Sequence, residues 1–191
     1  HNRCRRQRQM CIRDSRGNFL QFGTIDLRKI IIDTDPGQDD ALAMMTAFGA
    51  KKDLNVLGVT CVAGNVPLDL TSVNALKICE LSGFFSVPVF RGSPAPLKRK
   101  LITAEHVHGK TGLDGTDLSV IKKELEPTDA VDFIIECTEK YRDEKITICA
   151  LGPLTNIAKV LKKASVLTES IEEIVLMGGG FFEGGNITPA A

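Results

Sequence analysis

The chain alternates short runs rich in β-branched residues with longer segments whose apolar residues recur at helical spacing. The strand-like runs occupy residues 28–33, 54–64, 87–90, 145–152 and 171–180, and the helix-like segments occupy residues 39–50, 67–83, 127–143 and 153–164. Strands that alternate with helices indicate an α/β fold: an open, mainly parallel sheet with helices on both faces. Ligands of such sheets bind beyond the carboxyl ends of the strands, so functional residues are expected there.

Four carboxylates lie within the eight residues of the stretch DTDPGQDD, which begins at the end of the first strand-like run. As separate residues they have structural explanations: Asp39 as a helix cap, Asp40 as a complement to the helix dipole, and the other two as turn formers. As a cluster they would repel one another and raise one another's pKa unless something neutralised them. A hard divalent cation with oxygen ligands does so, and the pattern therefore predicts a magnesium or calcium ion held by Asp35 and Asp40.

Composition argues against several kinds of partner. The 24 Lys and Arg residues balance the 24 Asp and Glu residues, so the chain has no overall basic field to attract nucleic acid or an anionic membrane. No apolar stretch approaches the roughly 20 residues needed to span a bilayer. The six cysteines show no zinc-site spacing, and buried free thiols are favoured over a disulfide framework. We therefore expect a cytoplasmic protein.

The first 24 residues differ in character from the rest, since they are rich in arginine, poor in aliphatic residues and without a period. We exclude residues 1–24 from the fold and assign residues 25–191 to the folded domain. A non-native or disordered leader is favoured over a mitochondrial targeting peptide, because the segment lacks a clear amphipathic face. An arginine-rich arm for nucleic acid is a weaker alternative.

The motif DTDPGQDDA resembles the signature of the inosine-uridine-preferring nucleoside hydrolase family. The likeness continues through VTCVAGN, HVHGKTGLDG, ALGPLTNIA and IVLMGGGFFEGGNITP, and so covers essentially residues 29–191. It implies a Rossmann-like open sheet and a calcium enzyme that hydrolyses the N-glycosidic bond of ribonucleosides to free base and ribose. It also implies a role in nucleoside catabolism and salvage, and it leaves a homo-oligomer open.

The resemblance assigns the metal ligands. The carboxylates of Asp35 and Asp40 and the backbone carbonyl of Leu151 correspond to calcium ligands, and Asp33 corresponds to a residue beside the metal. Asp35 also corresponds to the residue that takes a proton from the attacking water. Carboxylates suit this reaction without reference to the family, because the bond to the base breaks through an oxocarbenium-like state whose positive charge they favour.

Four further residues correspond to the substrate site of the family. Asp39, Asn65 and Asn186 would bind the ribose, and His108 would lie near the base and assist its departure. Structural explanations stay open for two of them, since Asn65 would serve as a turn residue at a strand end and His108 as a solvated loop histidine.

Other residues near these motifs are expected to have structural roles only. Asn156 should donate or accept a hydrogen bond at a helix N-terminus, Met177 should belong to the core, and residues 98–100 should form a solvated basic face.

The family continues beyond the position of residue 191, and its remaining portion supplies further ligands for calcium and ribose. We expect the sequence to be a fragment, because every site motif before that point is intact. One alternative is a truncated, non-catalytic relative that binds a nucleoside or ribose. The other is a phosphatase of the haloacid dehalogenase type, which also begins with a strand and a DxD motif. That type needs a small or hydroxyl residue after the second aspartate, where this chain has Pro36.

Overall fold

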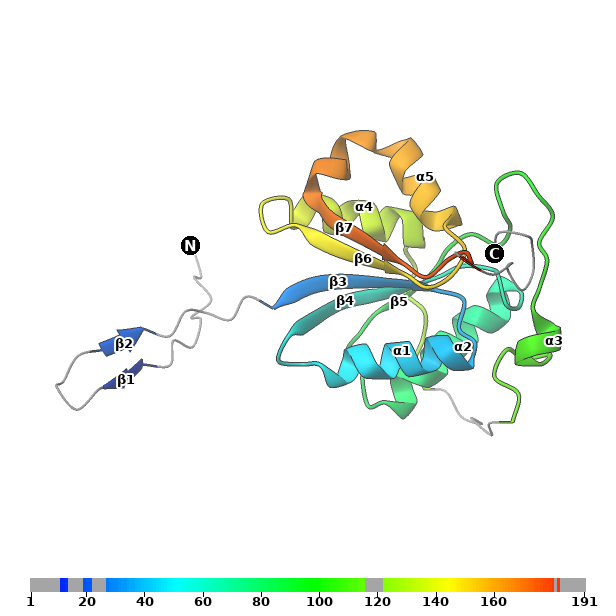
Figure 1. Cartoon of the computed structure of the whole chain (residues 1–191), viewed down its shortest axis with the longest axis horizontal. Coiled ribbons are helices and arrows are strands. Elements are labelled where there is room, and N and C mark those ends of the chain that lie inside the picture. The colour runs from blue at the N-terminus through cyan, green and yellow to red at the C-terminus, as the bar shows by residue number, and fades with distance from the viewer. Residues whose placement is uncertain (1–10, 14–18, 22–26, 116–121, 181, 183–191) are drawn as a thin grey trace.

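The computed structural model describes residues 11–13, 19–21, 27–115, 122–180 and 182. Its centre is a five-stranded parallel sheet in the order β5-β4-β3-β6-β7 (Figure 1). The strands are β3 (Arg28–Thr34), β4 (Leu54–Cys61), β5 (Val89–Arg91), β6 (Ile146–Ala150) and β7 (Ile171–Leu176). This arrangement confirms the predicted open α/β sheet.

Helices cover both faces of the sheet, α1 (Gln38–Gly49) and α2 (Leu68–Leu81) on one side and α4 (Ala130–Lys140) and α5 (Thr155–Lys163) on the other (Figure 1). Successive residues of a strand point to opposite faces, so each face of the central strand β3 enters a different core. Ile30 and Ile32 pack in the cluster with α1 and α2, while Ile31 packs in the cluster with α4 and α5. A strand buried on both faces needs an unbroken apolar run, which explains the sequence of three isoleucines.

The chain reverses its direction of travel across the sheet at β3. From β3 it moves to β4 and β5 on one side, then crosses back to place β6 on the other side of β3. The loops after β3 and β6 therefore leave the sheet in opposite directions and leave a crevice between them, which is where ligands bind in open α/β sheets. The four clustered carboxylates directly follow β3, so the fold places them at this crevice.

The predicted elements end within a few residues of the observed ones, but four of the observed elements were not predicted. The described structure also contains the short helix α3 (Glu105–His108) and the 3-10 helix η1 (Ser165–Ser170). Within the segment that we excluded from the fold, β1 (Cys11–Arg13) and β2 (Phe19–Gln21) pair antiparallel as a separate two-stranded sheet. Among the helices that the structure describes, none is long and apolar enough to cross a membrane.

Candidate active site

The Asp35 side chain lies in a slot between two loops, one after β4 and one after β6. An alanine methyl carbon at Gly64 would lie 2.0 Å from Asp35 Oδ2, and one at Gly152 would lie 2.5 Å from Asp35 Oδ1. The backbone N–H of Asn65 donates a hydrogen bond of 2.7 Å to Oδ2. Only glycine at these two positions lets the backbones approach the carboxylate this closely.

Asp35 is an unusual carboxylate because it is only 5% exposed. Burial, together with the nearby charge of Asp40, raises the pKa of Asp35 to about 8 from its ordinary value of 3.8. A buried carboxylate with this pKa is largely protonated at neutral pH unless a positive charge joins it.

Asp40 is also buried, and it fastens the turn to the first helix. Thr34 Oγ1 donates 2.7 Å to its Oδ1, and the backbone N–H of Gly37 donates 3.0 Å to its Oδ2. Burial raises the pKa of Asp40, although these two hydrogen bonds oppose the shift. Asp40 therefore satisfies an N–H at the start of α1, and our structural alternative, in which Asp39 caps the helix, is wrong.

Asp39 and Asn65 lie where a ligand could reach them. Asp39 is exposed and lines the main cavity. The Asn65 side-chain nitrogen donates 2.9 Å to the backbone oxygen of Asp35 and 3.4 Å to Asp40 Oδ2. Because the amide nitrogen is engaged, the Asn65 Oδ1 atom is the part of the side chain that can accept a hydrogen bond from a ligand.

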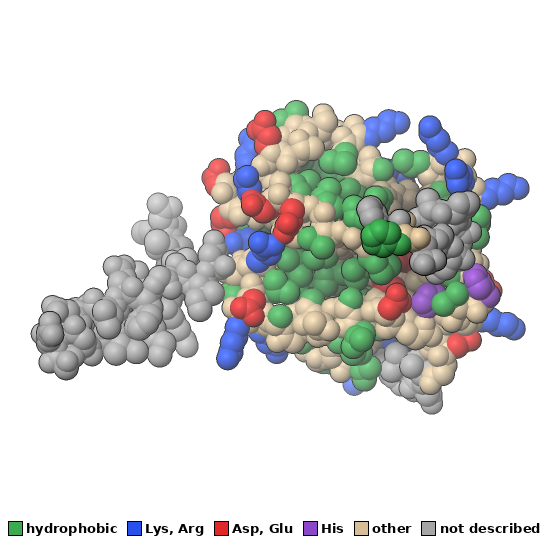
Figure 2. Space-filling view, in the orientation of Figure 1, with side chains coloured by type: hydrophobic (Ala, Val, Ile, Leu, Met, Phe, Trp, Pro, Cys, Tyr) green, Lys and Arg blue, Asp and Glu red, His purple; other side chains and the backbone are tan. Residues whose placement is uncertain are grey.

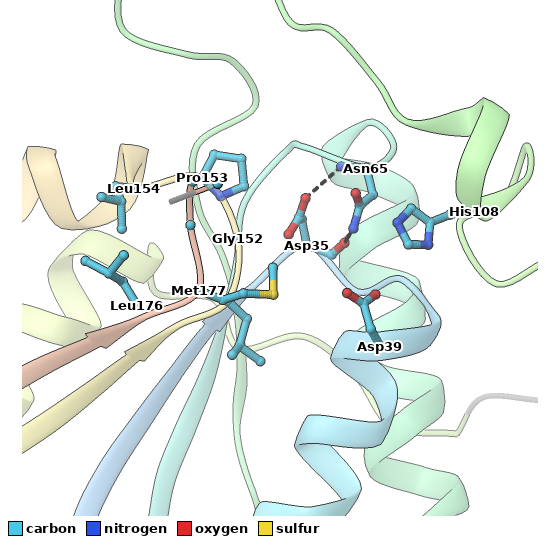
Figure 3. A pocket seen from close by; sticks show the side chains of 13 residues that line it. Asp35, Asp39, Asn65, His108, Gly152, Pro153, Leu154, Leu176 and Met177 are labelled. Carbon is cyan, nitrogen blue, oxygen red and sulfur yellow. Dashed lines mark hydrogen bonds between the residues drawn. The ribbon is translucent and has the colours of Figure 1, made fainter. Parts of the chain in front are cut away.

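The main cavity has a volume of about 730 Å³ and opens at the carboxyl ends of the strands (Figure 3). Asp35, Asp39, Asn65 and His108 form one side of it in the figure, and Leu154, Leu176 and Met177 lie on the other. Met177 is 57% exposed and lines this cavity, so the prediction that it belongs to the core is wrong. It follows β7, and a residue beyond the end of a strand leaves the covered part of the sheet. The cavity therefore combines a polar wall with an apolar one, as small-molecule sites commonly do.

Asp33 is fully buried beneath the Asp35 turn. Thr60 Oγ1 donates 2.5 Å and Asn156 Nδ2 donates 2.8 Å to its Oδ1, whereas its Oδ2 has no hydrogen-bond partner among the described residues. Burial raises the pKa of Asp33 to about 6, against these two hydrogen bonds.

Asn156 joins three strand ends. Besides its bond to Asp33 near the end of β3, its side chain donates 3.0 Å to the Cys61 carbonyl at the end of β4 and accepts 2.8 Å from the Ser93 N–H after β5. The role expected from sequence, a hydrogen bond at the N-terminus of its own helix, is therefore wrong. Its partners are distant along the chain, and no local pattern could have indicated them.

His108 ends α3 and lines the cavity, and its loop is attached to the carboxylate turn. Gln38 bonds to it from the first position of α1. The Asn74 side chain donates to the backbone oxygens of Pro36, at 3.2 Å, and Thr111, at 2.8 Å, so it ties the two loops together. Sequence reasoning missed both Gln38 and Asn74.

The donor atoms at this site suit a hard cation. Among the described residues, no three His, Cys, Asp or Glu side chains are grouped to hold a metal, so an ion here would also need backbone or amide oxygens. Such oxygens are ordinary calcium ligands, and Leu151, beside Asp35 in the cavity wall, carries one. Two buried carboxylates with raised pKa, and a cavity with no Lys or Arg among its described lining residues, fit a divalent cation. Asn186 lies outside the described residues.

Comparisons with known proteins agree with this geometry. Residues 30–191 match the family model described as inosine-uridine preferring nucleoside hydrolase. An uncharacterized protein of Schizosaccharomyces pombe is 50% identical over 163 residues, which are 85% of this chain and 52% of that protein. Pyrimidine-specific ribonucleoside hydrolase RihB of Escherichia coli is 44% identical over 167 residues, 87% of this chain and 52% of RihB.

A solved structure gives the same result in three dimensions. The purine-preferring ribonucleoside hydrolase of Gardnerella vaginalis superposes with a TM-score of 0.79 at 34% identity, covering 85% of this chain and 52% of that one. The chain thus spans about half the length of the relatives that it matches. The family match contradicts the haloacid dehalogenase alternative. On the sequence match, the fold and the position of the acidic turn, the chain belongs to the inosine-uridine preferring nucleoside hydrolase family.

Proposed function

We propose that the whole protein hydrolyses the N-glycosidic bond of ribonucleosides, with calcium as its cofactor, and releases the free base and ribose. The observation that carries the proposal is the Asp35 carboxylate, buried between Gly64 and Gly152 beside Asp40 at the carboxyl end of β3. Family membership supports ribonucleosides as substrates. The buried oxygen donors support a hard divalent cation, magnesium or calcium, and the resemblance to the family favours calcium. Asp35, Asp40 and the Leu151 carbonyl would hold the ion.

The residues divide the chemistry between them. When bound, calcium supplies a positive charge that lowers the pKa of a water molecule near it. Asp35 accepts a proton from the water as the water oxygen attacks C1′. The bond from C1′ to the base breaks, its electron pair leaves with the base, and the base takes up a proton from solvent. The buried carboxylate of Asp33, below Asp35, adds negative charge that favours an oxocarbenium-like transition state.

The polar wall of the cavity binds the ribose. Asp39 and the Oδ1 atom of Asn65 accept hydrogen bonds from sugar hydroxyls and hold C1′ in line with the attacking water. We propose Asn186 as a third sugar contact, and His108 as a contact near the base. Four cysteines whose side chains the structure describes are free thiols: Cys61, Cys79, Cys137 and Cys149. Free thiols support a reducing compartment such as the cytoplasm.

The test is release of ribose by the whole protein from uridine and from inosine, with calcium and with a chelator. The relatives include pyrimidine-specific and purine-preferring enzymes, so both kinds of base are needed. Asp35→Asn should lower kcat by roughly 10³-fold or more, since it removes both the general base and one negative charge from the metal site. Asp53→Asn, an exposed aspartate in the turn before β4, is the matched control and should be unchanged.

Two results would contradict the proposal. Near-normal turnover by Asp35→Asn would remove Asp35 from the reaction. Nucleoside binding without any turnover, in the presence of calcium, would favour the non-catalytic binding protein.

A further inference from the structure

Gln38 contacts His108 through both ends of its side-chain amide. Its Oε1 atom lies 2.6 Å from His108 Nδ1, and its Nε2 atom donates 3.3 Å to the His108 backbone oxygen. The two bonds join the first residue of α1 to the last residue of α3. The ring also sits directly on Gly37, where an alanine methyl carbon would lie 2.6 Å from Nδ1. The His108 ring is therefore held by the Gln38 side chain and by its contact with Gly37.

The two hydrogen bonds together determine where the ring proton lies. A backbone carbonyl only accepts, so the amide nitrogen of Gln38 must face it and the amide oxygen must face the ring. The amide oxygen also only accepts, so His108 Nδ1 must carry the hydrogen. In the neutral ring Nε2 is then an acceptor with no proton, and among the described residues it has no hydrogen-bond partner.

We propose that Gln38 is a positioning residue that holds neutral His108 as the Nδ1–H tautomer and so presents Nε2 as a hydrogen-bond acceptor to the nucleoside. The inference rests on the proposed function, because His108 lines the cavity assigned to the substrate. It changes the role expected for this histidine. A neutral ring with its proton on Nδ1 cannot give a proton to the departing base through Nε2, but it can bind a hydroxyl or N–H group of the ligand.

Ring ¹⁵N NMR of the chain tests the tautomer without any turnover. The chain has three histidines, so the spectrum is simple, and the exposed His106 serves as an internal reference. At a pH where the rings are neutral, His108 should show a protonated Nδ1 and an unprotonated Nε2. Gln38→Met keeps the length of the side chain but accepts no such bond, and it should release His108 to the Nε2–H form that free histidine prefers.

Gln38→Glu is the conservative variant, because a carboxylate oxygen still accepts from Nδ1–H. It should retain the Nδ1–H tautomer, whereas a purely steric role of Gln38 would give the same spectrum for all three proteins. Glu105→Gln, at an exposed position of α3, is the matched control and should leave the spectrum of His108 unchanged. An Nε2–H form in the unmodified chain, or an Nδ1–H form in Gln38→Met, would overturn the proposal.

Kinetics of the whole protein give a second readout. Loss of one hydrogen bond to the substrate should raise KM by about tenfold in Gln38→Met with little change in kcat. A fall in kcat at unchanged KM would overturn the acceptor role. If the unmodified protein hydrolyses no nucleoside, the proposed function fails, and the NMR result still decides whether Gln38 sets the tautomer of His108.

Discussion

At the scale of single residues, the site depends on what Gly64 and Gly152 lack. Their missing side chains make room for one carboxylate, and the backbone N–H after Gly64 donates to that carboxylate. The charge that a cation would meet is therefore fixed in position before the cation arrives, which lowers the cost of binding it. Asp35 is the acid of the cluster that is enclosed in this way, while Asp39 faces solvent.

Gly64→Ala should therefore disrupt the metal site. The added carbon would lie 2.0 Å from Asp35 Oδ2 and 2.8 Å from Pro153 Cδ, so the carboxylate must move. We expect calorimetry to show calcium affinity lowered at least about tenfold, and urea unfolding to show a loss of about 1–3 kcal/mol. Gly49→Ala, where nothing lies within 4 Å, is the control and should change neither measurement unfavourably. Unchanged calcium affinity in Gly64→Ala would contradict the proposed ligand.

The raised pKa of Asp35 predicts how the stability of the calcium-free chain varies with pH. The ordinary value of 3.8 applies to the unfolded chain, whereas burial raises the pKa to about 8 for Asp35 and about 6 for Asp33 in the folded protein. Between these limits the folded state binds more protons than the unfolded state. The stabilising contribution of these two groups is therefore fully present below about pH 4 and is lost as the pH rises toward 8.

Chemical unfolding in a chelator, repeated at several pH values, measures this effect. From about pH 7 to 8 Asp33 is already largely ionised in the folded chain, so the slope comes mainly from Asp35, which should lower the free energy of unfolding by up to about 1.4 kcal/mol per pH unit. Asp35→Asn should reduce the slope in this range, and Asp53→Asn should keep it. A slope that is the same in all three proteins would show that Asp35 is ionised in the folded chain.

The sequence predicted only part of the site, and distance along the chain explains the difference. Asp35 and Asp40 could be predicted because they share one turn at a strand end, and like charges so close need a counter-charge. Gln38 and Asn156 could not be predicted, since their partners lie 70 or more residues away in some of their bonds. Such bonds exist only once the loops of different strands meet.

At the scale of helices and strands, the periodicity of apolar residues predicted type and order well. Each of the five parallel strands and the four longer helices has a counterpart among the predicted segments. Ends were less accurate, as for residues 145–152, where the strand β6 covers Ile146–Ala150. A strand stops where its pairing partners stop, and the residues beyond it turn into the crevice. The short helix α3 has no buried residue and so no apolar pattern to reveal it.

The Asn156 side chain bonds to several of these elements, so its removal should destabilise the sheet. Asn156→Ala would leave the buried Ser93 N–H without its side-chain acceptor and would leave the buried Asp33 carboxylate with only the hydrogen bond from Thr60. We expect the free energy of unfolding to fall by about 2–4 kcal/mol, because buried polar groups that lose a partner are costly. Asn55→Ala, at an exposed position of β4, should cost no more than about 0.5 kcal/mol. Equal effects of the two variants in urea unfolding would show that the Asn156 bonds contribute no net stability.

In the molecule as a whole, the two edges of the sheet differ among the described residues. Beyond β5, Glu126 forms a bridge with Phe90, whereas β7 has no further strand beside it among the described residues. In the space-filling view, apolar side chains gather over the strands at the centre of the face that is shown (Figure 2). Val175 and Leu176 at the end of β7 are 51% and 53% exposed. An apolar edge strand offers both unpaired backbone groups and hydrophobic area to another molecule.

We therefore expect the chain of 191 residues to associate with itself, and to do so through β7. Sedimentation velocity over a range of concentrations should show species larger than the monomer. Val175→Lys should shift them toward the monomer, because a lysine on an edge strand must lose its hydration when another strand pairs there. Leu42→Lys is the matched control: Leu42 is 67% exposed but lies on helix α1, so its replacement should leave association unchanged. If the unmodified chain sediments as a monomer throughout, or if the two lysine variants behave alike, the edge of β7 is not the surface through which the molecules meet.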